Sequence, residues 1–178
     1  MPRSEGTDLP PRVMLVRHDR STRAFLGPSL SAEERERLRA IDPETAYEHP
    51  ERITRLLDGG NPAGWEHVGL FRFRIAPSPE QIGIATRQGE HFVVFQEGRP
   101  VAWAWSMREH ALAEEAAVET VREFRNRGFG RQALAAWISH VVRSGKIAYY
   151  PTPEREVVGG RLASSLGGEQ LATMKALP

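Results

Sequence analysis

The alternation of apolar and polar positions is clearest in the middle of the chain. Two β-like runs, 92–95 and 101–107, flank Gln96-Glu97-Gly98-Arg99-Pro100, and this segment favours a tight turn between antiparallel strands. Successive side chains of a strand point to opposite faces, so one face of the second run collects its larger residues. Those residues are Val101, Trp103, Trp105 and Met107.

Helical periodicity is strongest after residue 130. An apolar stripe recurs there at i, i+3, i+4, i+7 and i+8, which predicts an amphipathic helix over 131–143 that ends near Gly145. Ser31 and Glu34 form a capping-box pattern before a predicted helix at 32–41. Shorter helices are predicted at 50–57 and 154–166. The stripe of the long helix consists of Leu134, Trp137, Ile138, Val141 and Val142.

Short apolar or alternating runs between these helices predict the remaining strands. They lie at 13–16, 68–75, 116–121, 147–150 and 170–174. Strands therefore alternate with helices, and we expect an α/β (α+β) fold. Residues 1–11 are polar and rich in proline, so we expect a loosely ordered tail before a single domain at 12–178.

Composition excludes several classes of function. The 178 residues contain no cysteine, and 24 basic against 23 acidic residues give a net charge of +1. Disulfides and thiolate chemistry are therefore excluded, and no bulk field attracts nucleic acid or an anionic membrane. No segment resembles a signal peptide or a membrane span, so we expect a soluble cytoplasmic protein. The six histidines show no metal-ligand spacing with carboxylates, and we expect no metal.

The chemistry concentrates in the segment Arg125-Asn126-Arg127-Gly128-Phe129-Gly130, between a predicted strand and the long helix. A helix N-terminus offers unpaired N–H groups and partial positive charge to a phosphate. Gly128 and Gly130 would let the backbone turn and approach an anion, because a Cβ there would block the ligand or forbid the dihedral angle. Arg125, Arg127 and Arg131 add charge. The alternative is a purely structural tight connection, and neither a Walker loop nor a dinucleotide fingerprint is present.

This segment resembles the acetyl-CoA loop of the GNAT superfamily of N-acetyltransferases, which reads Gln or Arg, two residues, Gly, one residue, Gly or Ala. Thr120 and Glu123-Phe124 extend the match, whereas Arg122 replaces a common proline. The resemblance covers about residues 92–171. It implies a mixed, mostly antiparallel central sheet flanked by helices, with a splayed strand pair for acetyl-CoA. It also implies an acceptor-side half at about 12–90 and an acetyl-CoA-binding half at about 91–178.

The resemblance further implies which groups hold acetyl-CoA. The backbone of three strand residues would pair with the pantetheine arm as an added strand. The amides of residues 126–131 would hold the pyrophosphate beside Arg125. The strand residues are Val118, Glu119 and Thr120, and the loop residues are Asn126, Arg127, Gly128, Phe129, Gly130 and Arg131.

Acetyl transfer requires a neutral amine, so a base must accept the ammonium proton. Glu115 and Glu119 are four residues apart and would share a strand face, so either can serve as base. The resemblance favours Glu115, at the start of this strand, and a solvated turn at Glu114-Glu115 is the alternative. Tyr150 is a candidate acid, and His110 a candidate base or substrate contact that is otherwise a surface residue.

Several departures weaken the assignment of an acid. The last predicted helix has Ala163 where the family has a tyrosine, and Glu156 and Gly159 replace an asparagine and a serine. The sequence thus predicts an N-acetyltransferase acting on a small-molecule or peptide amine, with a non-catalytic acyl-CoA-binding or regulatory module as the alternative. A nucleic-acid module fits poorly, because its charges alternate in sign. A homodimer is the default expectation. Trp103, Trp105 and Trp137 are predicted core residues, and Trp65 a candidate for the acceptor pocket.

Overall fold

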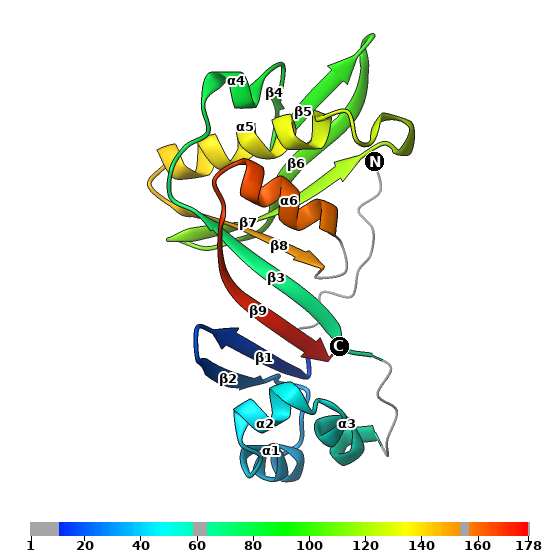
Figure 1. Cartoon of the computed structure of the whole chain (residues 1–178), viewed down its shortest axis with the longest axis vertical. Helices are drawn as coiled ribbons and strands as arrows, with labels where there is room; N and C mark the ends of the chain where they lie inside the picture. Colours follow the sequence, from blue (N-terminus) through cyan, green and yellow to red (C-terminus); the bar gives the residue numbers. More distant parts are fainter. Residues whose placement is uncertain (1–10, 59–63, 154–156, 178) are drawn as a thin grey trace. The chain divides into compact units, whose positions relative to one another are not determined.

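In a computed structural model, residues 11–58, 64–153 and 157–177 are described, and these residues form a nine-stranded sheet (Figure 1). The strands are β1 (Val13–His18), β2 (Ser21–Leu26), β3 (Glu66–Phe73), β4 (Thr86–Gln88), β5 (His91–Gln96), β6 (Arg99–Glu109), β7 (Ala113–Thr120), β8 (Ile147–Pro153) and β9 (Glu169–Leu177). Their order is β2-β1-β9-β3-β8-β7-β6-β5-β4. The mixed, mostly antiparallel sheet flanked by helices confirms the predicted fold class.

Helices follow the strands in the order expected from the sequence, with some additions. None of the helices in the described ranges is long and apolar enough to cross a membrane. The helices are α1 (Ala32–Arg39), α2 (Pro43–Glu48), α3 (Glu51–Asp58), α4 (Pro79–Ile82), α5 (Phe129–Arg143) and α6 (Val157–Ser165), with a 3-10 turn η1 (Arg122–Phe124). Of the predicted last helix, residues 154–156 lie outside the described residues.

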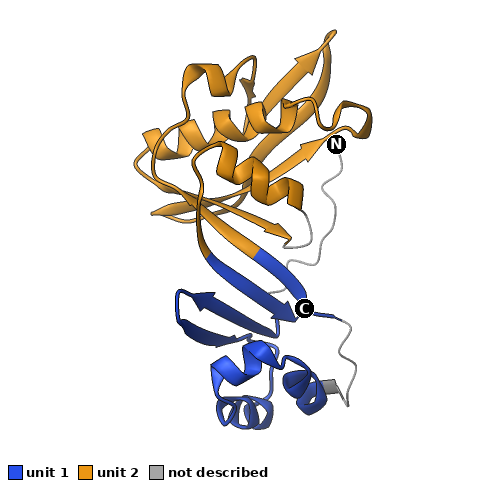
Figure 2. Cartoon of the chain, viewed as in Figure 1, with its two compact units in different colours: residues 1–68, 172–178 blue, residues 69–171 orange. Residues whose placement is uncertain are grey.

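The chain divides into two compact units (Figure 2). Unit 1 comprises residues 1–68 and 172–178, and unit 2 comprises residues 69–171. Each unit has its own cluster of buried apolar side chains. The expectation of a single domain, with halves that meet near residue 90, stays a prediction.

In unit 1, β1 pairs antiparallel with β2 and with β9. The predicted capping box of α1 is confirmed: Ser31 Oγ accepts from the Glu34 amide, and the Glu34 carboxylate accepts from the Ser31 amide. The sequence analysis missed β2 and α2. Strand β2, Ser-Thr-Arg-Ala-Phe-Leu, is largely exposed, so it lacks the apolar alternation that marks a half-buried strand.

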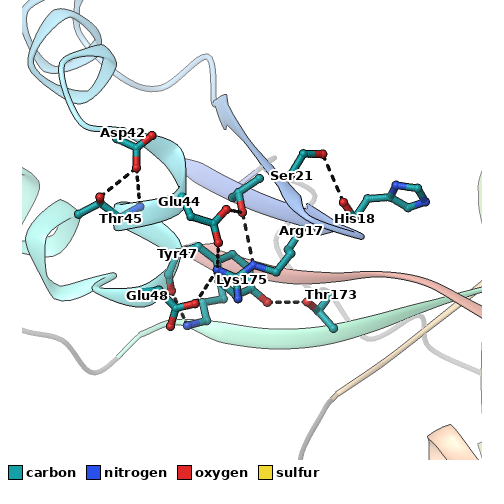
Figure 3. A network of polar contacts seen from close by, with 11 residues as sticks. Arg17, His18, Ser21, Asp42, Glu44, Thr45, Tyr47, Glu48, Thr173 and Lys175 are labelled. Carbon is teal, nitrogen blue, oxygen red and sulfur yellow. Dashed lines mark hydrogen bonds and ion pairs between the residues drawn. The ribbon is translucent and has the colours of Figure 1, made fainter.

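Helix α2 contacts the strands of unit 1 through Tyr47, which is only 6% exposed (Figure 3). The Arg17 guanidinium and the Lys175 ammonium lie 3.8 and 4.5 Å from its ring centroid. The Tyr47 hydroxyl and the Thr173 hydroxyl are 2.6 Å apart, and Lys175 Nζ donates to the Tyr47 carbonyl. Arg17 is itself paired with two carboxylates of α2, those of Glu44 and Glu48. This network joins α2 to β1 and β9.

In unit 2, α5 packs on one face of β5, β6 and β7 (Figure 1). The strand residues below it are small, so the helix approaches closely and Trp137 is fully buried. Trp103 and Trp105 lie on the other face of β6 and are only partly buried, so the prediction that both are core residues is wrong. The small residues beneath the helix are Ala102, Ala104 and Ala116.

Candidate active site

Strands β7 and β8 are parallel, and they pair only where each begins. The paired residues are Ala113 with Ile147, Glu114 with Ala148, and Glu115 with Tyr149. Beyond Glu115, the β7–β8 ladder has no further rung within the described residues, although β7 stays paired with β6 as far as Thr120. Residues 116–120 therefore present an open backbone edge, a template on which an extended group can add as a strand.

The loop after β7 delivers the chain to the N-terminus of α5. Gly128 is the N-cap with φ +81°, and Asn126 also has positive φ, at 61°. No side chain caps this helix, so the N–H groups of its first turn face the loop without a side-chain acceptor. A Cβ at Gly128 would meet nothing within 4 Å, so the dihedral angle alone requires glycine there.

Gly130 is required for a different reason. A Cβ at this position would lie 2.7 Å from Thr120 Oγ1 and 3.6 Å from Val118 Cγ1. Glycine therefore lets the first turn of α5 rest against the end of β7. The structure thus shows a packing requirement between helix and strand at Gly130, and the idea that a Cβ there would block a ligand stays a prediction.

Two of the three predicted arginines, Arg125 and Arg127, have side chains that contact residues next to the N-terminus of α5. Arg125 Nε donates to the Thr120 carbonyl at 3.2 Å. The Arg127 guanidinium lies 5.2 Å from the ring centroids of both Phe124 and Phe129. These contacts keep two cationic side chains beside the uncapped helix N-terminus.

The Arg131 side chain is engaged elsewhere. Its Nε donates to Ser165 Oγ at 3.1 Å, and its Nη2 donates to the Ser165 carbonyl at 3.2 Å. Ser165 is the last residue of α6, so this arginine connects the start of α5 to the end of α6. Its backbone amide remains a candidate anion donor, whereas its guanidinium has a structural role.

Glu115 lies on the sheet face opposite α5, at the last rung before β7 and β8 part. Its side chain is 21% exposed, and its Oε1 is 2.7 Å from Arg108 Nη1. Burial raises the pKa of Glu115, and Arg108 offsets only part of that rise. The alternative of a solvated turn at Glu114-Glu115 is wrong, because both residues belong to β7.

Glu114 points to the opposite face and is only 9% exposed. Its carboxylate accepts hydrogen bonds from Lys146 Nζ at 2.6 Å and from Ser106 Oγ at 2.5 Å, and Ser106 Oγ accepts from Trp137 Nε1 at 2.9 Å. Burial alone would raise the pKa of Glu114, but the bonds from Lys146 and Ser106 outweigh it and lower that pKa. This network links β6, β7, α5 and the start of β8. Nothing in the sequence identified it, because its members are far apart in the chain.

The predicted catalytic residues are only partly brought together. Glu119 is exposed and lies on the same face as Glu115, opposite Trp103 of β6. Tyr150 packs against the core of unit 2, on the α5 face. Tyr149, the residue before it, is the tyrosine that shares the face of Glu115, because paired residues of neighbouring strands point the same way.

The departures noted in the last helix have structural roles. Ala163 is fully buried in the core of unit 2, and a Cβ on Gly159 would lie within van der Waals overlap of Thr152 Oγ1. Glu156 lies outside the described residues. His110 is exposed in the turn between β6 and β7, and the Trp65 indole donates to Thr54 Oγ1 in unit 1.

No protein-family model matches the sequence, and no curated protein matches it. Among solved structures, the chain is similar to a protein assigned to the GNAT family of acetyltransferases from Novosphingobium aromaticivorans, with 19% identity, a TM-score of 0.54 and coverage of 65% of each chain. It is also similar to a GCN5-related N-acetyltransferase-like protein from Streptococcus suis, with 13% identity, a TM-score of 0.55 and coverage of 94% of this chain and 84% of that one. The chain thus spans just under two thirds of the first of these proteins. At such identities the likeness concerns the fold, and the chain has the fold of the GNAT acetyltransferases.

Proposed function

We propose that this chain is an acetyl-CoA-dependent N-acetyltransferase that moves an acetyl group to a primary amine of a small molecule or a peptide. The observation that carries the proposal is the end of the β7–β8 ladder at Glu115 and Tyr149. The same strand then runs into the uncapped N-terminus of α5. One strand therefore joins an open backbone edge to an anion-binding helix end.

The residues of β7 and α5 fit the two ends of acetyl-CoA. The first-turn amides of α5 and the nearby Arg125 and Arg127 suit a pyrophosphate. The pantetheine arm carries amides, and these suit the open edge of β7 at Val118, whose backbone groups point away from β6. The backbone of Glu119, which the resemblance also implied, is directed at Trp103 of β6. The Thr120 carbonyl already accepts from Arg125, so it contributes less to this edge.

Glu115 is the proposed general base. It accepts a proton from the acceptor's ammonium group, and the neutral nitrogen then attacks the thioester carbonyl carbon. The new C–N bond forms, the C–S bond breaks, and the nitrogen gives up its second proton while the coenzyme A thiolate takes one. The raised pKa of Glu115 makes its carboxylate a stronger base than a solvated glutamate.

Glu119 and the two tyrosines remain alternatives for moving protons. Glu119 lies on the same face but is more exposed than Glu115. Tyr149 is placed on the face of Glu115, whereas Tyr150 would serve as acid only from the α5 face.

A non-catalytic acyl-CoA-binding or regulatory module is the second candidate. The observation that favours it is Ala163, which is buried in the core where the family has a tyrosine, so this part of α6 offers no phenol. The two candidates share the acetyl-CoA site and differ in turnover. Release of coenzyme A in the presence of an amine would eliminate the second candidate.

Calorimetric titration of acetyl-CoA tests the shared site, with Gly128→Glu as the disrupting variant. This change adds a side chain and a negative charge to the loop at a residue of positive φ. Gly98→Glu is the matched control, because Gly98 also has positive φ and open surroundings but lies in the β5–β6 turn. We expect wild type and Gly98→Glu to bind and Gly128→Glu to lose binding. A wild type that does not bind acetyl-CoA would refute the proposal.

The pH dependence of turnover tests the base. Glu115 must be ionised to accept a proton, so kcat/KM should fall as the pH drops through its raised pKa. Glu115→Gln should lower kcat/KM by roughly 100-fold or more, the usual contribution of a general base, and should remove that acidic limb. If Glu115→Gln keeps wild-type turnover and pH profile, the base is another group, with Glu119 next to be tested.

A further inference from the structure

The face of the sheet that carries Glu115 also carries an arginine placed there by a β-bulge. In β6, the register against β7 shifts between Ser106 and Arg108, so that Ser106 pairs with Ala116 and Arg108 with Glu115. Regular alternation would turn residue 108 to the same face as Ser106, beneath α5. The bulge at Met107 instead turns Arg108 toward Glu115. Bulges that re-aim a side chain in this way are frequent next to active sites.

The two partners of this ion pair differ sharply in exposure. Glu115 is mostly covered, whereas the Arg108 side chain is 71% exposed, although one of its nitrogens lies 2.7 Å from the carboxylate. A guanidinium has five N–H donors, so one contact leaves most of its hydrogen-bonding capacity directed at solvent. Because the Arg108 side chain is surrounded by water, its attraction to Glu115 is screened and adds little to stability. The stability gained from this ion pair therefore does not explain why β6 contains a bulge.

From this arrangement we infer that the acceptor is an amine that also carries a carboxylate close to its nitrogen, as an amino acid does. The inference rests on the proposed function. The acceptor's ammonium group pairs with Glu115, which takes its proton, while its carboxylate pairs with the exposed side of Arg108. Arginine binds carboxylates through two parallel hydrogen bonds, which fixes orientation as well as position. Arg108 is thus a specificity-determining residue.

The same geometry disfavours two other classes of acceptor. An amine that carries a further positive charge near its nitrogen would place that charge against Arg108. An amine without an anionic group would compete with the Arg108–Glu115 ion pair and offer Arg108 nothing in return. Both classes should therefore react less well than an amino acid of similar size.

Matched pairs of acceptors test the inference: α-amino acids and their carboxamides, assayed by coenzyme A release in the presence of acetyl-CoA. The measured quantity is the ratio of kcat/KM for acid and amide, in wild type and in Arg108→Gln. The same acid and amide are used with wild type and variant, so the difference in intrinsic basicity between their amines cancels when the two ratios are compared. We expect Arg108→Gln to lower the ratio roughly 10-fold or more, as for loss of a charge-assisted hydrogen bond. Arg108→Lys should retain part of it.

Arg99→Gln is the matched control, because Arg99 is an exposed arginine at the other end of β6. It should leave the ratio of kcat/KM for acid and amide unchanged.

An unchanged ratio in Arg108→Gln, or amides that react as well as acids in the wild type, would overturn the inference and leave the proposed function intact. Loss of acetyl-CoA binding by the wild type would overturn the proposed function itself. If acetyl-CoA binds but no acceptor reacts, the amino acids are titrated by calorimetry into the protein saturated with coenzyme A. Failure of the amino acids to bind would then refute the inference.

Discussion

Replacement of Gly130 by alanine should reveal how tightly α5 is seated on β7. The added Cβ would lie 2.7 Å from Thr120 Oγ1, closer than such contacts allow. Overpacking of this kind costs about 1–3 kcal/mol. Alanine is also a better helix former than glycine by up to about 1 kcal/mol. We therefore expect Gly130→Ala to lower the free energy of unfolding by about 0–3 kcal/mol.

Thr120→Ala removes the atom that the new methyl group would meet, and the next contact, Val118 Cγ1, is an ordinary 3.6 Å away. In that background the steric cost disappears and the helix propensity remains. Gly130→Ala should then be neutral or stabilising by up to about 1 kcal/mol, so the coupling free energy between the two sites is about 1–3 kcal/mol. For a chain of this length 1 kcal/mol shifts Tm by about 2–4 °C.

The assay is thermal and urea unfolding of the four members of this double-mutant cycle, followed by circular dichroism. Gly128→Ala is the control: it should cost about 1–2 kcal/mol through its positive φ in either background, because nothing lies near its Cβ. The double variant should still bind acetyl-CoA, since the added methyl group points at β7. If Gly130→Ala costs the same with and without the Thr120 hydroxyl, the packing explanation is refuted.

Two further perturbations concern the polar networks of the two units. Tyr47→Phe removes the hydroxyl that lies 2.6 Å from Thr173 and should lower the free energy of unfolding by about 1–2 kcal/mol, measured by urea unfolding; an unchanged midpoint would show that this contact is not stabilising. The lowered pKa of Glu114 means that its stabilising contribution is present above the pKa of an unfolded glutamate and is lost as the pH falls through its folded-state pKa. Glu114→Gln should therefore be less stable than wild type at neutral pH, with a difference that shrinks toward acid pH in pH-dependent unfolding.

Local signals in the sequence predicted several elements of both units. The apolar stripe of α5, the capping box of α1 and the turn between β5 and β6 all appear close to their expected positions. Each depends on residues within a few positions of one another, so a single segment contains the necessary information. Strand β2 lacks such a signal, because it is largely exposed and pairs with β1. Helix α2 has one, an Asp42 N-cap followed by Pro43, and the sequence analysis did not use it. The contacts of Tyr47 with Thr173 and Lys175 join residues that are far apart in the chain, so no local pattern reports them.

The arrangement of side chains around the site was harder to predict, because it depends on register. A bulge at one residue of β6 decides that Arg108 faces Glu115, and the pairing of Glu115 with Tyr149 decides which tyrosine shares its face. Neither the position of a bulge nor the register of a parallel pair follows from hydrophobic alternation. For the same reason the sequence singled out Glu115 but not its neighbour Glu114.

These two neighbouring carboxylates have opposite environments because successive residues of a strand point to opposite faces. Glu114 is hydrogen-bonded by Lys146 and Ser106 beneath α5, which lowers its pKa, whereas burial on the other face raises the pKa of Glu115. Glu114 and Lys146 thereby join β7 to the start of β8 just before the strands part, and Glu115 occupies the last rung of the ladder. Titratable groups whose environments push their pKa values apart commonly divide their roles in this way. The point where β7 and β8 part thus has the hydrogen-bonded carboxylate of Glu114 on one face and, on the other, the carboxylate that we propose as general base.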